Sequence, residues 1–275
     1  MAGTKNLRSR LAPPADQAVE NRFFALFEIL SDASSDEEMG SDAERADSHI
    51  SYDDGIAYWN SIPATVDGVL GGFGNTTLPR ADMRGSSGFI EKIARKLPDF
   101  GAIVATGTAC DIGAGIGRVT RDVLAKHFAT VDLVEPVQSF ADQIEPELAA
   151  ASKLHVLGTI YRVGAQSFTP DAGKYAVIWC QWCLGHLTDE QLVAFLRRCI
   201  TGLAPAGLIF VKENNTSGFE DEFDSVDSSV TRSNKSFQRA FAAAGLTVVH
   251  IELQPGLPTG LYPVRMYALR PAASS

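Results

Sequence analysis

The sequence predicts an α/β fold in which helices cover both faces of a doubly wound, mostly parallel sheet, with an antiparallel strand at one edge. Three observations support this prediction. From about residue 50, short apolar runs alternate with helical patterns, glycines join one apolar run directly to the next helix, and no helical pattern separates the last two runs. Such alternation is typical of parallel strands joined by helical crossovers.

The expected elements follow in order along the chain. A helix at 87–97 leads into the sheet, and apolar, often β-branched runs predict seven strands at 108–111, 130–135, 159–163, 175–180, 207–213, 247–253 and 265–269. Helical patterns fill the gaps at 117–128, 137–150, 188–202 and 232–244. Prolines and glycines between residues 255 and 260 predict a turn, so we expect the last two strands to pair antiparallel.

Residues 1–50 differ in composition from the rest of the chain. Residues 31–48 are rich in Ser, Asp and Glu and predict a disordered acidic linker. Before the linker, apolar residues share one helical face, which predicts an amphipathic helix within 17–30: Val19, Phe23, Leu26, Phe27 and Leu30. We expect this N-terminal extension to dock on its own domain rather than on a partner, and we expect one catalytic domain over 51–275.

The net charge of −9 is spread unevenly, because residues 1–50 hold ten Asp or Glu against five Lys or Arg. No Lys/Arg cluster offers the basic face that nucleic-acid binding needs, so a cationic substrate fits better. No apolar stretch reaches the roughly 18–20 residues of a membrane span, and the N-terminus has no apolar signal core. We therefore expect an intracellular protein, in the cytoplasm, the nucleus or both, and by default a monomer.

Four cysteines fall in expected core elements, which is typical of reduced thiols: Cys110, Cys180, Cys183 and Cys199. The Cys180-x-x-Cys183 pair has no second ligand pair at zinc-site spacing. We expect neither a metal site nor a redox role for it.

Residues 111–118, with the sequence DIGAGIGR, join an expected strand to an expected helix. Gly113, Gly115 and Gly117 permit positive φ and close approach of a ligand to the main chain, next to the unpaired N–H groups of a helix N-terminus. The G-x-G-x-G spacing differs from the G-x-G-x-x-G of dinucleotide binders. The loop favours adenosine plus a carboxylate, as in S-adenosylmethionine, over NAD, and a simple tight turn is the alternative.

Glu135 closes the next apolar run, about twenty residues beyond the glycine loop. In open α/β sheets this position places a carboxylate on the ribose hydroxyls of a nucleotide. Four further segments are not explained by core packing alone: 58–74, suited to a lid, 179–187 after the fourth strand, 212–215 ending the fifth, and the acidic loop 220–230, which either stays solvated or receives a cation.

The chain resembles the eukaryotic protein α-N-terminal methyltransferases in a specific combination of motifs: YW…IP.TVDGVLGGFG, DIGAGIGRVT, IWCQWCLGHLTD, LRRC, VKENN and D.VDSSVTRS. The resemblance covers about residues 52–270, and the first fifty residues have no counterpart. It implies a seven-stranded, Rossmann-like S-adenosylmethionine-dependent methyltransferase fold. It also implies methylation of the α-amino group of protein N-termini that begin Xaa-Pro-Lys or Xaa-Pro-Arg, with S-adenosylhomocysteine as product.

The resemblance implies a role for each matching residue on the cofactor side. Gly113 and Arg118 would hold the methionine part of S-adenosylmethionine, Arg118 by pairing with its carboxylate, and Glu135 would bind the ribose. Ala165 and Gln166 would flank the adenine, and Gln181 would contact the methionine end. The family commonly has Leu and Asp at the positions of Ala165 and Glu135.

On the substrate side, the resemblance implies an acid-lined channel for an extended peptide. Trp59 and Trp182 would form its walls, Tyr58 and Tyr262 would line it, and Asn214 would bond a peptide carbonyl. Asp224 and Asp227 would attract the basic third residue and the α-amino group, with Ser229 nearby.

Methyl transfer to an amine requires that the amine first lose its proton, and a carboxylate or imidazole within reach can accept it. Asp227 and His186 are the candidates for this role. The alternatives are a solvated loop carboxylate for Asp227 and a histidine that caps the helix starting near Thr188 for His186, while Trp59 and Trp182 could be core residues. At the level of function, the alternatives are a small-molecule N- or O-methyltransferase and a non-catalytic cofactor-binding module.

Overall fold

A computed structural model describes residues 45–273. The amphipathic helix expected within 17–30, and most of the expected linker at 31–48, lie outside this range. Within the described end of that linker, Asp47 is not solvated, because it is buried in a 3₁₀ turn, Ala46–His49. The Asp47 carboxylate accepts a hydrogen bond from the backbone N–H of Asp189 at 2.8 Å, and it thereby stabilises a helix N-terminus.

All seven expected strands are confirmed, and they form one sheet. Its order is β3 (Leu157–Tyr161), β2 (Thr130–Val134), β1 (Thr108–Ile112), β4 (Tyr175–Gln181), β5 (Leu203–Asn214), β9 (Val264–Pro271) and β8 (Leu246–Leu253). The first five strands are parallel, and β9 lies antiparallel between β5 and β8. The order reverses direction between β1 and β4, the position where open α/β sheets bind ligands.

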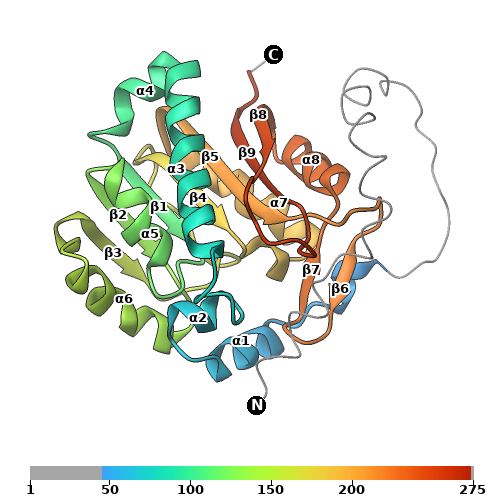
Figure 1. The fold of residues 1–275 in the computed structure, drawn as a ribbon. Coiled ribbons are helices and arrows are strands. Elements are labelled where there is room, and N and C mark those ends of the chain that lie inside the picture. Colours follow the sequence, from blue (N-terminus) through green and yellow to red (C-terminus); the bar gives the residue numbers. More distant parts are fainter. Residues whose placement is uncertain (1–44, 274–275) are drawn as a thin grey trace.

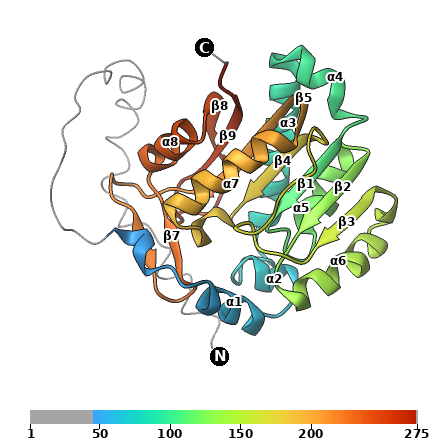
Figure 2. The same ribbon diagram turned by 180° about the vertical axis from the view of Figure 1, so that it is seen from behind.

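Helices cover both faces of the sheet, as expected. One face packs against α3 (Leu78–Lys96), α4 (Pro98–Val104), α5 (Arg118–Asp122) and α6 (Gln138–Ala150), and α3 crosses this face in Figure 1. The other face packs against α7 (Asp189–Gly202) and α8 (Asn234–Ala243), seen from behind in Figure 2. Val177 and Trp179 of β4 enter the first core, while Ile178 and Cys180 enter the second, as the alternation of strand side chains requires.

Two helices differ from their expected limits. The helix expected at 117–128 is α5 followed by a separate 3₁₀ turn, Leu124–Lys126, because the backbone leaves the helical region at the buried Val123 (φ −123°, ψ −70°). The entry helix α3 begins at Leu78 rather than near residue 87. Its early turns include Gly85, where only glycine fits because the side chain of Gln254 occupies the space that a Cβ would fill.

Three short features surround the carboxyl ends of the strands. The expected lid, 58–74, contains the end of α1 (Tyr52–Ser61) and all of α2 (Val66–Val69), which lie together at the lower end of the sheet in Figure 1. The expected acidic loop contains a hairpin of β6 (Glu222–Asp224) and β7 (Ser229–Thr231). The backbone N–H of Ser51, the N-cap of α1, donates to Ser228 Oγ in the hairpin turn at 2.8 Å, so α1 and the hairpin are directly joined.

The four cysteines are free thiols, and Cys110, Cys180 and Cys199 are buried in the core. Burial raises the pKa of these three thiols. Within residues 45–273 there is no group of three or more His, Cys, Asp or Glu side chains placed to hold a metal ion. Over the same residues, the helices are too short or too polar to cross a bilayer.

Candidate functional site

A cavity lies at the carboxyl ends of β1, β2 and β4, covered by α1. All seven residues expected on the cofactor side line it: Gly113, Gly115, Arg118, Glu135, Ala165, Gln166 and Gln181. Trp59, Trp182 and His186 line the same cavity. The structure therefore brings the expected cofactor residues together with three of the residues expected to act on the substrate.

The glycine loop has the backbone conformation that its sequence predicts. Gly113, Gly115 and Gly117 have φ values of +65°, +57° and +80°. The N–H groups of Gly113 and Ala114 both donate to the Val134 carbonyl, at 2.9 and 3.1 Å, which fixes the loop against β2. A Cβ on Gly113 would lie 2.4 Å from Cys183 Cβ, so this position has no room for any other residue.

Glu135 is buried beside this loop. Its Oε2 accepts the N–H of Gly115 at 2.7 Å, and its Oε1 accepts the N–H of Val137 at 2.8 Å. Burial raises the pKa of Glu135 to about 7, although both hydrogen bonds oppose the shift. An ionised carboxylate offers about four acceptor positions, so two remain for hydroxyl groups of a ligand.

Arg118 and Gln181 are held by a residue that the sequence analysis did not identify. Asp82 of α3 accepts hydrogen bonds from Arg118 Nη1 at 2.6 Å and from Gln181 Nε2 at 2.8 Å. Asp82 occupies the buried face of α3 with Leu78 and Ser86. A charged residue on the buried, mostly apolar face of a helix could have identified Asp82. It was missed because the helix was predicted to begin near residue 87.

Trp59 of α1 contacts His186, which follows β4. The indole Nε1–H donates to His186 Nε2 at 3.0 Å. Because an indole nitrogen only donates, Nε2 carries no proton in this arrangement, and a neutral His186 then has its proton on Nδ1. His186 does not cap α7, because Thr188 does so in a capping box with Gln191.

Trp182 has a strained backbone and an unsatisfied polar atom. Its φ is +55°, which is costly for a bulky residue and is found mainly at functional sites. Among the described residues, nothing accepts a hydrogen bond from its buried Nε1–H. The guanidinium of Arg118 lies 5.8 Å from the centre of its rings. A buried donor beside the cavity indicates that a ligand supplies the acceptor.

Asp227 is buried, so the alternative of a solvated loop carboxylate is wrong. Its Oδ1 accepts a hydrogen bond from Ser229 Oγ at 2.6 Å. A Cβ on Gly55 of α1 would lie 3.3 Å from the Asp227 carbonyl oxygen and 3.5 Å from His186 Nδ1. The backbone of Asp227 and the ring of His186 therefore both lie next to Gly55 of α1.

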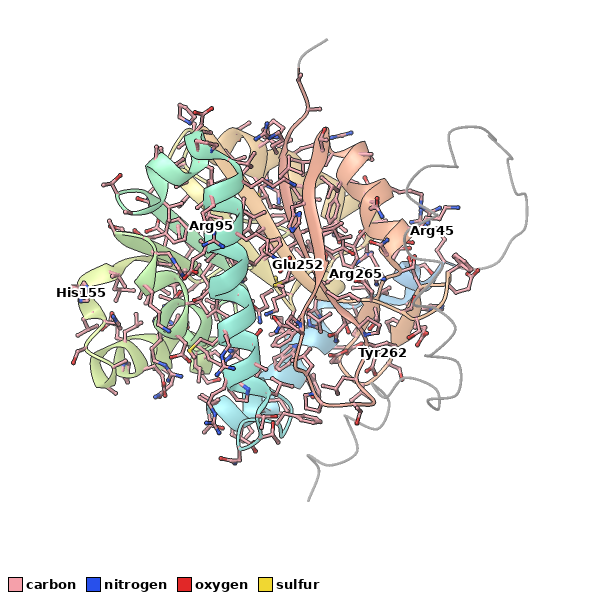
Figure 3. The ribbon with its side chains drawn as sticks, turned by 45° about the horizontal axis from the view of Figure 1, so that its top comes forward. Arg45, Arg95, His155, Glu252, Tyr262 and Arg265 are labelled. Carbon is pink, nitrogen blue, oxygen red and sulfur yellow. The ribbon has the colours of Figure 1, made fainter. Side chains whose placement is uncertain are left out.

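The remaining expected substrate residues lie on the hairpin side of the molecule. Asp224 and Tyr262 line a second cavity formed mainly by the β6–β7 hairpin, and the Tyr262 hydroxyl donates to Glu222. Figure 3 shows Tyr262 on this side, opposite His155 beyond α6. The rings of Tyr58 and Trp59 pack edge to face, with 5.1 Å between their centroids. Asn214 is the last residue of β5. Tyr58, Asn214, Asp227 and Ser229 line neither of these two cavities.

Comparison with known proteins gives concordant results. Residues 47–270 match the family model described as AdoMet dependent proline di-methyltransferase. The chain is 46% identical to "Alpha N-terminal protein methyltransferase 1" of Schizosaccharomyces pombe, over 81% of this chain and 97% of the relative. It is 43% identical to "N-terminal Xaa-Pro-Lys N-methyltransferase 1" of Danio rerio, over 80% and 95% of the two chains.

Solved structures agree with the fold. A SAM-dependent methyltransferase from Leishmania major superposes with a TM-score of 0.72 at 37% identity, covering 80% of this chain and 82% of the other. A phosphoethanolamine N-methyltransferase from Haemonchus contortus superposes with a TM-score of 0.63 at 16% identity, covering 81% and 50%. The second likeness shows the fold alone, because the same fold serves many substrates.

Proposed function

The chain belongs to the family of AdoMet-dependent proline dimethyltransferases, and we propose that it methylates the α-amino group of proteins that begin Xaa-Pro-Lys or Xaa-Pro-Arg. The main support for this proposal is that the expected cofactor residues line the same cavity as Trp59, Trp182 and His186. A small-molecule methyltransferase would share the cofactor residues but would not need the acidic hairpin beside α1.

The residues of the cavity fit S-adenosylmethionine, which supplies an electrophilic methyl group on a sulfonium centre. Arg118 would pair with its carboxylate, and Glu135 would accept hydrogen bonds from the ribose. Ala165 and Gln166 would flank the adenine, Gln181 would contact the methionine end, and Gly113 and Gly115 would allow close approach to the main chain. The buried Trp182 Nε1–H, for which residues 45–273 supply no acceptor, supports the assignment, because a bound molecule would supply one.

The protein contributes alignment of the amine and removal of its proton. A peptide α-amino group has a pKa of about 7.7–8.0, so roughly a tenth to a sixth of it is already neutral at pH 7. The buried Asp227, oriented by Ser229, is the first candidate acceptor for the proton of the remainder. His186 is the second, and its Nε2 becomes available when Trp59 gives up its hydrogen bond. Peptide binding between Trp59 and Trp182 would have this effect.

The peptide would extend from the cavity toward the hairpin. Asp224, Glu222 and Tyr262 surround the second cavity, and carboxylates there suit a basic third residue. Tyr58 and Asn214 would contact the peptide between the two cavities. The net charge of −9 favours encounter with cationic N-termini.

The test uses the full chain with S-adenosylmethionine and a peptide beginning Ser-Pro-Lys. We expect methyl groups on the α-nitrogen, located by fragment-ion mass spectrometry. The same peptide with an acetylated N-terminus, which keeps every side chain, should gain none. Absence of methylation at the free α-nitrogen would refute the proposal, and cofactor binding without methylation of any such peptide would favour a non-catalytic module.

Three further properties are part of this proposal. Residues 51–275 form the catalytic domain, and residues 1–50 form an N-terminal extension. The protein acts as a monomer and binds neither nucleic acid nor membrane. Its place is the cytoplasm, the nucleus or both, where proteins with free N-termini are available to it.

A further inference from the structure

We propose that Asp82 is a positioning residue of the cofactor site, whose carboxylate sets the orientation of Arg118 and Gln181. This inference rests on the proposed function, since that function places both residues at the methionine end of S-adenosylmethionine. Asp82 itself does not line the cavity. It lies behind the cavity wall, on α3, at a position with 0% exposure.

The Asp82 carboxylate divides its two oxygens between three partners. Oδ2 accepts from Arg118 Nη1 at 2.6 Å, and Oδ1 accepts from Gln181 Nε2 at 2.8 Å and from Lys212 Nζ at 2.5 Å. Arg118 begins α5 and Gln181 ends β4. One buried side chain therefore fixes two cavity residues that come from different parts of the chain.

Lys212 of β5 fixes the orientation of Asp82 in turn. Its fully buried Nζ also donates to the Asp82 carbonyl at 3.2 Å, to Ser86 Oγ at 2.8 Å and to Gln254 Oε1 at 2.7 Å. The amide of Gln254 donates to the carbonyls of Ala81 and Pro255. Lys212 thus connects the Asp82 carboxylate to the backbone of Asp82, to Ser86 on the same helix and to Gln254 in the turn after β8.

Gln181 and Arg118 each have a second contact, which determines which of their polar groups face the cavity. Gln181 Oε1 accepts the indole N–H of Trp179 at 3.1 Å, which determines which end of the amide faces Asp82. The guanidinium of Arg118 lies over the rings of Trp182. Asp82 uses one of the five N–H groups of Arg118, so others remain for a ligand carboxylate.

Stability alone gives a weak reason for this arrangement. Replacing a buried ion pair by apolar residues of similar volume is often neutral or favourable for folding. Here Arg118 and Lys212 lower the pKa of Asp82 despite its burial, so the charge is kept. The buried charge of Asp82 is therefore better explained by its role in orienting Arg118 at the cavity wall than by stability.

The test is a double-mutant cycle on the affinity for S-adenosylhomocysteine, measured by calorimetry, with Asp82→Asn and Arg118→Gln. Asp82→Asn should weaken binding roughly tenfold, as loss of one charge-assisted hydrogen bond does. Arg118→Gln should weaken it more, and the double variant should lose less than the sum of the two single losses, because only the part of the effect that acts through Gln181 remains. In turnover, Asp82→Asn should raise the KM for the cofactor and leave kcat within about twofold.

A second pair of variants separates orientation from folding. Asp82→Asn leaves Lys212 unpaired, so the cycle is repeated in a Lys212→Met background, where no buried amine remains. Asp82→Asn in that background should keep the Tm of Lys212→Met and still bind roughly tenfold more weakly. Arg121→Gln is the matched control on α5: it loses partners at Asp122 and Glu147 but should keep wild-type affinity.

Additive losses in the cycle would overturn the inference, as would unchanged affinity on adding Asp82→Asn to Lys212→Met. If the wild-type chain failed to bind S-adenosylhomocysteine, the proposed function would fail first, and this inference with it.

Discussion

The cofactor half and the peptide half of the site are built in different ways. In the cofactor half, the glycine loop is bonded to β2, and Glu135, Arg118 and Gln181 each have buried partners. In the peptide half, the backbone N–H of Ser51 at the start of α1 bonds to Ser228 of the hairpin turn, and Trp59 of α1 bonds to His186 after β4. The comparison suggests that the cofactor half is preformed, whereas the peptide half rearranges when the substrate enters.

The largest expected effect separates the two halves by chemistry. Replacing Asp227 by Asn removes the candidate base and keeps the shape, so turnover on a Ser-Pro-Lys peptide should fall about 10²- to 10⁴-fold. Affinity for S-adenosylhomocysteine should stay within about twofold, because Asp227 does not line the cofactor cavity. Asp53→Asn, an exposed acid on α1, serves as the control. Turnover close to wild type would remove Asp227 from the mechanism.

The preformed loop can be tested at Gly113. An Ala there must adopt φ +65° and would place its Cβ 2.4 Å from Cys183 Cβ. We expect affinity for S-adenosylhomocysteine to fall roughly 10- to 100-fold, in line with the 1–3 kcal/mol typical of such strain. Gly173→Ala is the matched control, since Gly173 has φ +69° and open space around it. Equal losses of affinity in both variants would show that backbone strain alone matters and would contradict a packed loop.

The pH dependence of cofactor affinity tests Glu135. With a pKa of about 7, Glu135 is mostly protonated at pH 6 and mostly ionised at pH 8. Ribose hydroxyls bond the ionised form best, so affinity for S-adenosylhomocysteine should rise about tenfold over this range. Calorimetry on Glu135→Gln should give a nearly flat profile. A wild-type profile as flat as that of the variant would contradict the assignment.

The same shift has a consequence for the stability of the ligand-free protein. Since the folded pKa of Glu135 exceeds its ordinary value of 4.5, the folded state retains the proton longer than the unfolded state does. The stabilising contribution is complete below about pH 4.5 and is lost as the pH rises through about 7. Burial also raises the pKa of Asp111, to about 6, and the charges of Asp111 and Glu135 repel each other. Comparison of the Tm values of wild type and Glu135→Gln against pH therefore reports Glu135 together with its coupling to Asp111.

The smallest expected effect concerns the contact between Trp59 and His186 in the peptide half. Trp59→Phe removes one neutral hydrogen bond to His186 and keeps most of the ring. Because peptide binding would break this bond, its loss should lower the KM for the peptide roughly 3- to 10-fold, as about 0.5–1.5 kcal/mol would, with cofactor affinity unchanged. Steady-state kinetics with each substrate varied in turn measures both. A larger change in cofactor affinity than in peptide affinity would contradict the division into halves.

The sequence was most informative where the chemistry is local. The buried strands were found because they are continuous apolar runs, and the glycine loop was found because Gly113 to Gly117 are contiguous. Glu135 followed from a fixed distance along a βαβ unit. These features together account for the sheet and the cofactor half of the site.

The features that were missed depend on contacts between distant residues. Asp82 meets Arg118 across 36 positions and Lys212 across 130, and no local pattern predicts such pairs. The first turns of α3 were also missed. They include Gly85, a residue that disfavours helices but is needed here because the side chain of Gln254 leaves no space for a Cβ. The hairpin within the acidic loop was missed because β6 and β7 are only three residues each and are stabilised by α1 and the 3₁₀ turn Ala46–His49.

A crystal structure of the full chain with S-adenosylhomocysteine and a hexapeptide beginning Ser-Pro-Lys tests the central claim most directly. We expect the product between Gly113, Arg118 and Glu135 with the glycine loop unchanged, the peptide amine facing Asp227 and His186, and Trp59 released from His186. A peptide bound elsewhere, or a Trp59–His186 bond that persists and closes the channel, would contradict this account.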